Sequence, residues 1–314
     1  MSRLQEKHPL NPFTNRGVIT SPDEFFGREQ EIAEIVSRLR AMASLSIVGE
    51  RRIGKSSLLY HLYQTGWLRV DDPAYCFFYL DLQDAQFHTA AGFLRAILRE
   101  LKLNADAVSE GQSLNRNMVA FSKQIEAQER AGRRVVLCLD EFETTLKHRA
   151  EFTEDFFDHL RSQLNRRMFA VVTATTKLLQ DLCEAGKLTS PFYNVFTVVK
   201  LGDFTDKEVR AFLEHYRDKV SFTEEEMKII NSRLDRHPLK LQILCDFVIR
   251  NRERRLAGRA LGKEIDREYG NFFVDKYNHK ILKLIKKCFS LDNLKKVLET
   301  IKAIKDAFKG SDKR

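Results

Sequence analysis

Long hydrophobic runs, paired cysteines and a signal peptide are all missing from this sequence of 314 residues. No run approaches the roughly 20 apolar residues that a membrane-spanning helix needs, and the polar N-terminus does not resemble a signal peptide. The five cysteines are widely spaced, and no two of them have the spacing of zinc ligands. These absences argue against a membrane-spanning protein, a disulfide scaffold and a zinc module, and they predict a cytoplasmic protein with reduced thiols.

Most of the chain also has no net charge, although it contains many charged residues. Residues 1–250 hold as many acidic as basic side chains, so residues 251–314 carry the whole net charge of +9. A partner attracted by charge is therefore expected at the C-terminal fifth of the chain. The length and the hydrophobic content of 43% suffice for one large α/β domain and a smaller second one.

The sequence does contain a complete phosphate-binding loop. Residues 49–56 read Gly-Glu-Arg-Arg-Ile-Gly-Lys-Ser and fit the pattern G-x-x-x-x-G-K-[ST], between an apolar run and a helical pattern. Backbone N–H groups of such a loop and of the following helix bind phosphate oxygens. Lys55 is expected to reach the β- and γ-phosphates, and the Ser56 hydroxyl to ligate Mg²⁺. The nucleotide-binding residues predicted here are Gly49, Glu50, Arg51, Arg52, Ile53, Gly54, Lys55, Ser56 and Ser57.

A second apolar run ends in two adjacent carboxylates, Asp140 and Glu141. Ligand chemistry in parallel α/β sheets lies at the carboxyl ends of the strands. Asp140 suits a Mg²⁺ shared with a triphosphate, and Glu141 is placed to polarise an attacking water, which makes it and Lys55 the predicted catalytic residues. The alternative is an ordinary surface Asp-Glu pair. Together, the two motifs predict a protein that binds ATP or GTP and hydrolyses it.

Strand and helix patterns alternate up to residue 202. Strands are expected at 45–48, 74–82, 133–139, 169–175 and 196–201, and helices at 27–43, 88–102, 114–131 and 152–165. This alternation predicts an α/β fold with a parallel, doubly wound sheet. Two capping-box patterns, at Thr205 and Thr223, then predict an all-helical second domain. The expected organisation is an extended arm (1–24), a P-loop core (25–202), a helical lid (203–272) and basic amphipathic helices (273–314).

Several motifs together resemble the STAND and origin-recognition-like branches of the AAA+ ATPases. They are Phe-Phe-Gly-Arg-Glu at 25–29, the P-loop, the Asp140-Glu141 pair, His237-Pro238 at a helix start, and Asn-Pro-Phe at 11–13. The resemblance covers residues 10–272. It implies a sheet with the order 5-1-4-3-2, a helical lid, and ATP with Mg²⁺ as the ligand. The sequence also lacks the Asn-Lys-x-Asp motif that reads guanine.

The resemblance further implies roles for residues outside the P-loop. Gly27 and Arg28 would lie beside the adenine, and His237 with Pro238 would form a lid motif near the nucleotide. His237 can equally be an ordinary helix-start residue, since proline is favoured at the first helical position. A polar residue at the end of the fourth strand would contact the γ-phosphate. Thr173, Thr175 and Thr176 are the candidates, and we favour Thr175, although threonine is also a common strand former.

Two departures from the family pattern concern arginine. Lys177 stands where relatives often have an arginine, and it lacks the bidentate guanidinium. Residues 184–191, where an arginine finger is often found, contain none. Hydrolysis that is slow or stimulated by a partner is therefore expected. Arg51 and Arg52 either sense a partner or are solvated loop charges.

The basic C-terminal end has the pattern of two amphipathic helices, at 276–289 and from Ser290 onward. They could pack on their own domain, bind a protein partner or a second copy, or bind nucleic acid; a membrane surface is the least favoured partner. We predict an ATP-dependent molecular switch that couples nucleotide state to partner binding or self-assembly. The alternative is a nucleic-acid-dependent ATPase of the origin-recognition or helicase-loader kind.

Overall fold

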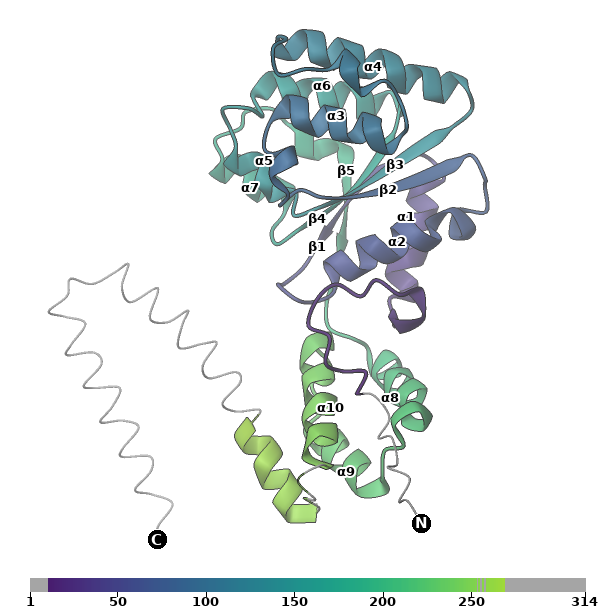
Figure 1. Ribbon diagram of the computed structural model, residues 1–314, viewed down its shortest axis with the longest axis vertical. Helices are drawn as coiled ribbons and strands as arrows, with labels where there is room; N and C mark the ends of the chain where they lie inside the picture. The colour runs from purple at the N-terminus through teal and green to yellow at the C-terminus, as the bar shows by residue number, and fades with distance from the viewer. Residues whose placement is uncertain (1–10, 253, 255, 257, 269–314) are drawn as a thin grey trace, which may run out of the picture. The chain divides into compact units, whose positions relative to one another are not determined.

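The computed structural model describes residues 11–252, 254, 256 and 258–268 (Figure 1). The described residues form two compact units, one comprising 11–222 and 234–242, the other 223–233 and the described part of 243–268. The predicted amphipathic helices beyond residue 273 lie outside the described residues. In the part that is described, no helix is long and apolar enough to cross a membrane.

Five parallel strands form the sheet of the first unit, in the order β2-β3-β4-β1-β5. This confirms the predicted order. In the register, Val48 pairs with both Thr175 and Lys200, so three strands end at one edge of the sheet. The strands are β1 (Ser44–Val48), β2 (Tyr75–Asp81), β3 (Arg134–Asp140), β4 (Ala170–Thr175) and β5 (Phe196–Lys200).

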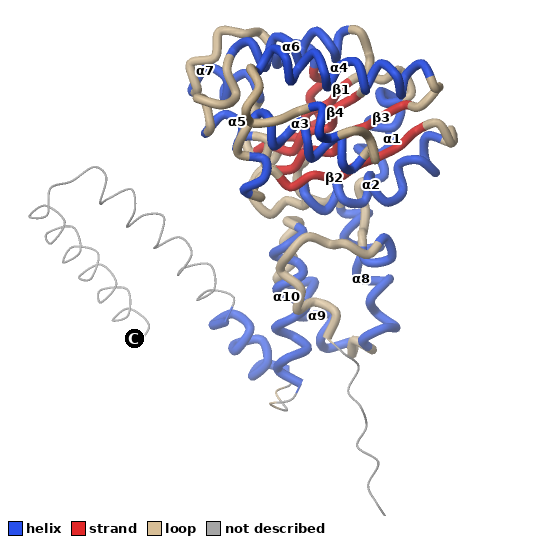
Figure 2. The backbone as a smooth tube through the Cα atoms, turned by 45° about the horizontal axis from the view of Figure 1, so that its top comes forward, coloured by secondary structure: helices blue, strands red, loops and turns tan. Residues whose placement is uncertain are grey.

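Helices cover both faces of the sheet (Figure 2). One face carries α1 (Glu29–Leu39) and α2 (Lys55–Val70), and the other carries α3 (Ala90–Glu100), α4 (Leu114–Arg130) and α6 (Glu154–Asn165). The short helices α5 (Glu143–Lys147) and α7 (Leu179–Ala185) follow β3 and β4. The resulting three-layer arrangement confirms the predicted α/β fold.

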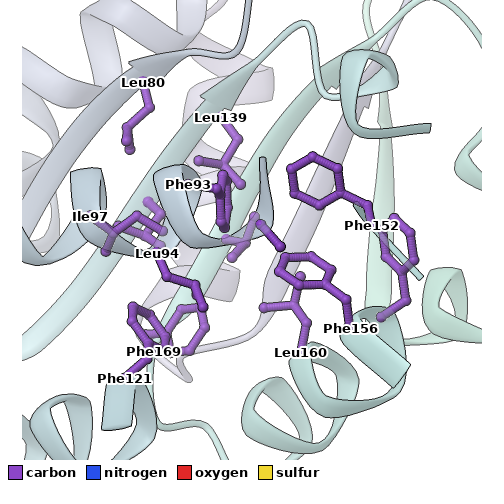
Figure 3. Close-up of a cluster of buried hydrophobic side chains, with 14 of the residues drawn as sticks. Leu80, Phe93, Leu94, Ile97, Phe121, Leu139, Phe152, Phe156, Leu160 and Phe169 are labelled. Carbon is purple, nitrogen blue, oxygen red and sulfur yellow. The ribbon is translucent and has the colours of Figure 1, made fainter. Parts of the chain in front are cut away.

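Phenylalanine dominates the core between the sheet and α3, α4 and α6 (Figure 3). Phe152 packs edge-on against Phe93 and Phe156, with ring centroids 6.0 Å and 5.0 Å apart. Phe121 of α4 meets Phe169 beside β4 in the same geometry. Such aromatic pairs stabilise by about 0.5–1.5 kcal/mol beyond the burial of their area, so they fix the helices on this face of the sheet.

The helix before β1 is shorter than predicted. Gly27 and Arg28 have φ angles of 72° and 68°, in the left-handed region, so α1 begins at Glu29. It ends at Leu39, because Met42 in the turn to β1 is also left-handed, with φ of 52°. The pattern of apolar residues alone does not contain these backbone reversals.

Both predicted capping boxes are confirmed. Thr205 and Glu208 cap α8 (Asp206–Val220), which belongs to the first unit. Thr223 and Glu226 cap α9 (Glu224–Ser232) of the second unit. The remaining helical segments are α10 (Pro238–Arg252) and residues 258–268.

Candidate nucleotide-binding site

The P-loop joins the end of β1 to the start of α2. Gly54 has a φ of 102° and leads directly into the helix at Lys55. A Cβ at Gly49 would lie only 2.6 Å from the carbonyl oxygen of Leu201, so this position has room only for glycine. The loop is therefore held tightly between β1 and the end of β5, with the N-terminus of α2 open toward a ligand.

Lys55 is folded back onto its own loop. Its Nζ donates to the carbonyl oxygens of Gly49 (2.9 Å) and Glu50 (2.8 Å). Burial lowers the pKa of Lys55, and the nearby carboxylates of Glu143, Glu141 and Asp140 oppose this shift. The side chain thus sits among three negative groups at the mouth of the loop, where phosphate oxygens can replace the two carbonyls as acceptors.

The two predicted metal ligands lie together. Asp140 is 5% exposed, and the Ser56 hydroxyl lies close to its carboxylate. The Tyr79 hydroxyl donates to Oδ2 of Asp140 (2.9 Å), and the N–H of Glu141 donates to Oδ1 (3.0 Å). Burial raises the pKa of Asp140, while the Ser56 hydroxyl and the hydrogen bond from Tyr79 oppose the rise. A hydroxyl and a carboxylate close together are the oxygen ligands that suit Mg²⁺.

The residues after Asp140 bring two further carboxylates to this place. Glu141 has a φ of 50°, and it lines the cavity described below. Glu143, which was not predicted, accepts a hydrogen bond from the Thr176 hydroxyl at Oε1 (3.1 Å). Its Oε2 is buried without a hydrogen-bond partner among the described residues. An acidic group two residues after the Asp-Glu pair, at the start of a helix, is the sequence signal that points to it.

The three candidate threonines, two in β4 and one directly after it, lie in different surroundings. Thr175 is 1% exposed, and its hydroxyl donates to the carbonyl oxygen of Lys177 (2.7 Å), away from the cavity. Thr176 lines the cavity. Thr173 is fully buried in the strand. Thr176 is therefore the one of the three that lines the cavity beside the P-loop.

A cavity of about 320 Å³ adjoins the P-loop and lies entirely within the first unit. Ten of the predicted site residues line it, namely Arg28, Arg51, Arg52, Ile53, Gly54, Lys55, Ser56, Ser57, Glu141 and Pro238. Gly27, Gly49, Glu50, Asp140, Thr175 and His237 do not line it. Most of the further lining residues come from the arm, from the residues before α1, and from α8 and the loop before it: Arg16, Gly17, Val18, Ile19, Glu24, Phe25, Phe26, Phe204, Phe212 and Tyr216, and α10 adds Leu239 and Gln242.

The arm is bound to both the P-loop helix and α8. The N–H of Ile19 donates to the Ser57 hydroxyl (3.0 Å). Phe13 is 1% exposed and packs on Phe212 and Tyr216, with ring centroids 5.9 Å and 4.7 Å away. One short segment therefore connects the start of α2 with α8 across one side of the cavity.

Arg28, the buried arginine of the Gly-Arg-Glu box, contacts the P-loop, α1 and the start of α8. Its guanidinium donates to the carbonyl oxygen of Ile53 in the P-loop (3.2 Å), pairs with Glu31 (3.2 Å) and lies over the Phe204 ring (4.7 Å). Its backbone N–H donates to Glu208 (2.6 Å). The box therefore supports the loop and also lines the cavity.

At the start of α10, Pro238 lines the cavity and His237 does not. Burial lowers the pKa of His237, and its Nδ1 is buried without a hydrogen-bond partner in the described part of the chain. Its N–H donates to the carboxylate of Asp235 (2.9 Å), a helix-start contact. The structure thus brings the proline, rather than the histidine, to the cavity.

Several solved structures have a similar fold. The ORC2 protein of Aeropyrum pernix, in ADPNP–ADP complexes, has a TM-score of 0.59 and 13% identity, covering 82% of this chain and 70% of that one. The Walker-type ATPase of Pyrococcus abyssi has a TM-score of 0.59 and 16% identity, covering 86% and 80%. The ORC1 protein of A. pernix in complex with DNA has a TM-score of 0.53 and 15% identity, covering 79% and 66%.

At these identities, the similarity shows the fold alone. No curated protein matches the sequence. The family that does match is described as Novel STAND NTPase 2, over residues 30–250. This match and the fold confirm the predicted resemblance, and the chain belongs to the Novel STAND NTPase 2 family of nucleotide-binding proteins.

Proposed function

We propose that this protein binds ATP with Mg²⁺ in the P-loop cavity and hydrolyses it slowly, as a molecular switch. The observation that carries the proposal is the convergence of Lys55, Ser56 and Glu141 on one cavity, with the buried Asp140 carboxylate close to Ser56. Burying the Asp140 carboxylate costs free energy. A protein that used the fold only as a scaffold would gain nothing from this carboxylate beside the P-loop.

Each group has a role that follows from its position. The P-loop N–H groups and Lys55 bind the phosphates, and Lys55 exchanges its two carbonyl acceptors for phosphate oxygens. Ser56 and Asp140 would hold Mg²⁺, which neutralises charge on the triphosphate when bound. Glu141 orients the attacking water. Thr176 turns its hydroxyl from Glu143 to the γ-phosphate, so the end of β4 senses that group.

The base would lie against the aromatic and apolar side chains of the cavity. Phe26, Phe204, Phe212, Tyr216 and Leu239 are among the residues that line it. A planar heterocycle is well suited to such walls, because stacking and apolar burial require no specific donor or acceptor. Adenine is favoured over guanine because the chain lacks the guanine-reading motif.

Nucleotide occupancy would be transmitted through the arm and α8. Both line the cavity, and Phe13 packs the arm onto α8. A ligand that fills the cavity contacts both segments at once, so its binding energy can favour one arrangement of them. Partner binding or self-association would then respond to the nucleotide, with the basic C-terminal residues as the expected contact.

Hydrolysis tests the catalytic part of the proposal. Glu141→Gln should keep ATP binding but lower turnover by about 10²- to 10⁴-fold, the usual contribution of a positioned general base. Glu34→Gln removes the same charge from an exposed position on α1 and should leave turnover unchanged. Unchanged turnover in Glu141→Gln would remove this residue from its role. Repeating the assay with DNA separates the switch from the nucleic-acid-dependent alternative.

A further inference from the structure

A second cavity lies at the amino ends of the strands, whereas the P-loop lies at their carboxyl ends. It measures about 290 Å³ and lies at the amino ends of β3, β4 and β1, which are neighbours in the sheet. Five arginines line it, and we call it the arginine pocket: Arg40, Arg133, Arg134, Arg166 and Arg167. The other lining residues are Ala41, Met42, Glu129, Gly132 and Met168.

Three similar turns build the arginine pocket. Each turn ends a helix, passes through one left-handed residue and enters a strand: α1 to β1 at Met42, α4 to β3 at Gly132, and α6 to β4 at Arg167. In each, at least three backbone N–H groups after the helix donate back to carbonyls of its last turn. Because the three strands are adjacent, their turns place the arginines at one edge.

The positive charge of the pocket is largely uncompensated. All five arginines are exposed, and Glu129 is the one acidic residue in the lining. Among the described residues, Arg166 is the one of the five with an ion pair, at 3.2 Å from Glu126. Arg133 donates to the amide of Gln128 (3.1 Å), which is neutral.

Stabilisation of helix ends does not account for this cluster. Cations are favoured near helix C-termini, and Arg40 does donate to two carbonyls at the end of α2. In the three turns, however, backbone N–H groups already serve the terminal carbonyls. A helix end also gains little from a second or third cation, since these repel one another.

We propose that the arginine pocket binds the phosphates of a nucleic-acid strand. All five cations are arginines, whose planar guanidinium can hold two phosphate oxygens at once. Met42 and Met168 are buried, and the lining has no aromatic residue, so the pocket offers neither an apolar anchor for a protein nor a platform for a base. The pocket therefore contacts the sugar-phosphate backbone of the nucleic acid, and binding does not depend on the base sequence.

This site is separate from the nucleotide cavity. β1, β3 and β4 carry the arginine pocket at their amino ends and the P-loop, Asp140 and Thr175 at their carboxyl ends. Binding of nucleic acid here does not depend on whether ATP is hydrolysed, so the two proposals can fail independently.

Fluorescence anisotropy on the full chain tests the proposal, with a labelled 20-base-pair DNA of mixed sequence at several salt concentrations. The test variant combines Arg133→Gln, Arg134→Gln and Arg167→Gln. The control removes the same charge from exposed positions outside the pocket, by Lys123→Gln, Lys200→Gln and Lys207→Gln. Both variants keep residues 251–314, so any contribution of the basic C-terminal end is the same in both.

The test variant should bind at least tenfold more weakly at low salt, while the control stays within about twofold of the wild type. For the test variant, the slope of log K against log salt should become less steep by about 2 to 3, since each lost phosphate contact removes about 0.9 from its magnitude. An unrelated DNA sequence should bind equally well. If the triple variant melts early, the pair Arg133→Gln and Arg167→Gln, which leaves Arg134 near the Tyr75 ring, serves in its place.

Three results would overturn the proposal. The first is a test variant that binds DNA as tightly as the wild type does. The second is a control variant that loses as much affinity as the test variant. The third is displacement of the labelled DNA more effectively by polyglutamate than by unlabelled DNA of equal charge, which would indicate an acidic protein as the partner.

Discussion

Replacing Glu208 by glutamine tests how the Gly-Arg-Glu box is held to α8. Its Oε1 accepts the N–H of Arg28 (2.6 Å), and its Oε2 accepts the N–H (2.8 Å) and the hydroxyl (2.9 Å) of Thr205. Hydrogen bonds to a charged group contribute about 1.5–3 kcal/mol each when buried. Because Glu208 is only half-buried and glutamine keeps one acceptor, we expect a loss of about 1–2 kcal/mol in unfolding free energy.

The same carboxylate predicts a pH dependence. Burial alone would raise the pKa of Glu208, but the hydrogen bonds from Arg28 and Thr205 outweigh it and lower the pKa. A pKa below the unfolded value of about 4.3 means that the contribution is present above that pH and is lost as the pH falls through the folded value. The difference between wild type and Glu208→Gln should therefore be full at pH 7 and small near pH 3.

Urea unfolding at several pH values measures both effects. Glu214→Gln is the matched control, because it removes the same charge from α8, where the carboxylate is 4.0 Å from Arg217 and largely exposed. This control should change the unfolding free energy by less than about 0.5 kcal/mol. A Glu208→Gln protein as stable as the control at pH 7, or a stability difference that does not vary with pH, would show that the Glu208 carboxylate does not hold the box to α8.

Three further substitutions probe the site and its walls. Tyr79→Phe leaves Oδ2 of Asp140 without its buried donor and should lower the unfolding free energy by about 1–3 kcal/mol in urea melts; an unchanged midpoint would contradict this. Thr176→Val should reduce ATP turnover about a hundredfold, as for other transition-state donors, with ADP affinity unchanged by calorimetry; equal turnover would exclude the γ-phosphate contact. Phe13→Ala empties a buried position against Tyr216 and should cost about 3–5 kcal/mol; a loss below about 1 kcal/mol would show that the arm is not anchored.

The sheet and the P-loop could be predicted because their signals are local. Buried parallel strands give continuous apolar runs, and the loop has a fixed spacing of glycine, lysine and serine. The sheet order came from the family resemblance rather than from the patterns. The capping boxes at Thr205 and Thr223 were equally readable, since each lies within four residues.

The rest of the site depends on contacts that local patterns do not contain. The arm has no periodicity, and Phe13 meets its partners on α8 about 200 positions later in the chain. Thr175 and Thr176 differ only by one position, yet at the end of a strand one position decides whether a side chain faces the core or the ligand. The arginine pocket is likewise assembled from three distant turns.

Isothermal titration calorimetry with ATP and Mg²⁺ measures directly whether the P-loop cavity binds the nucleotide. It should be carried out on the wild type, on Lys55→Ala and on a control, Lys123→Ala, at an exposed site on α4. We expect one ATP per chain for the wild type and the control, and at least about tenfold weaker binding by Lys55→Ala, because a charged hydrogen bond is lost. No ATP binding by the wild type, or equal affinity in Lys55→Ala, would contradict it.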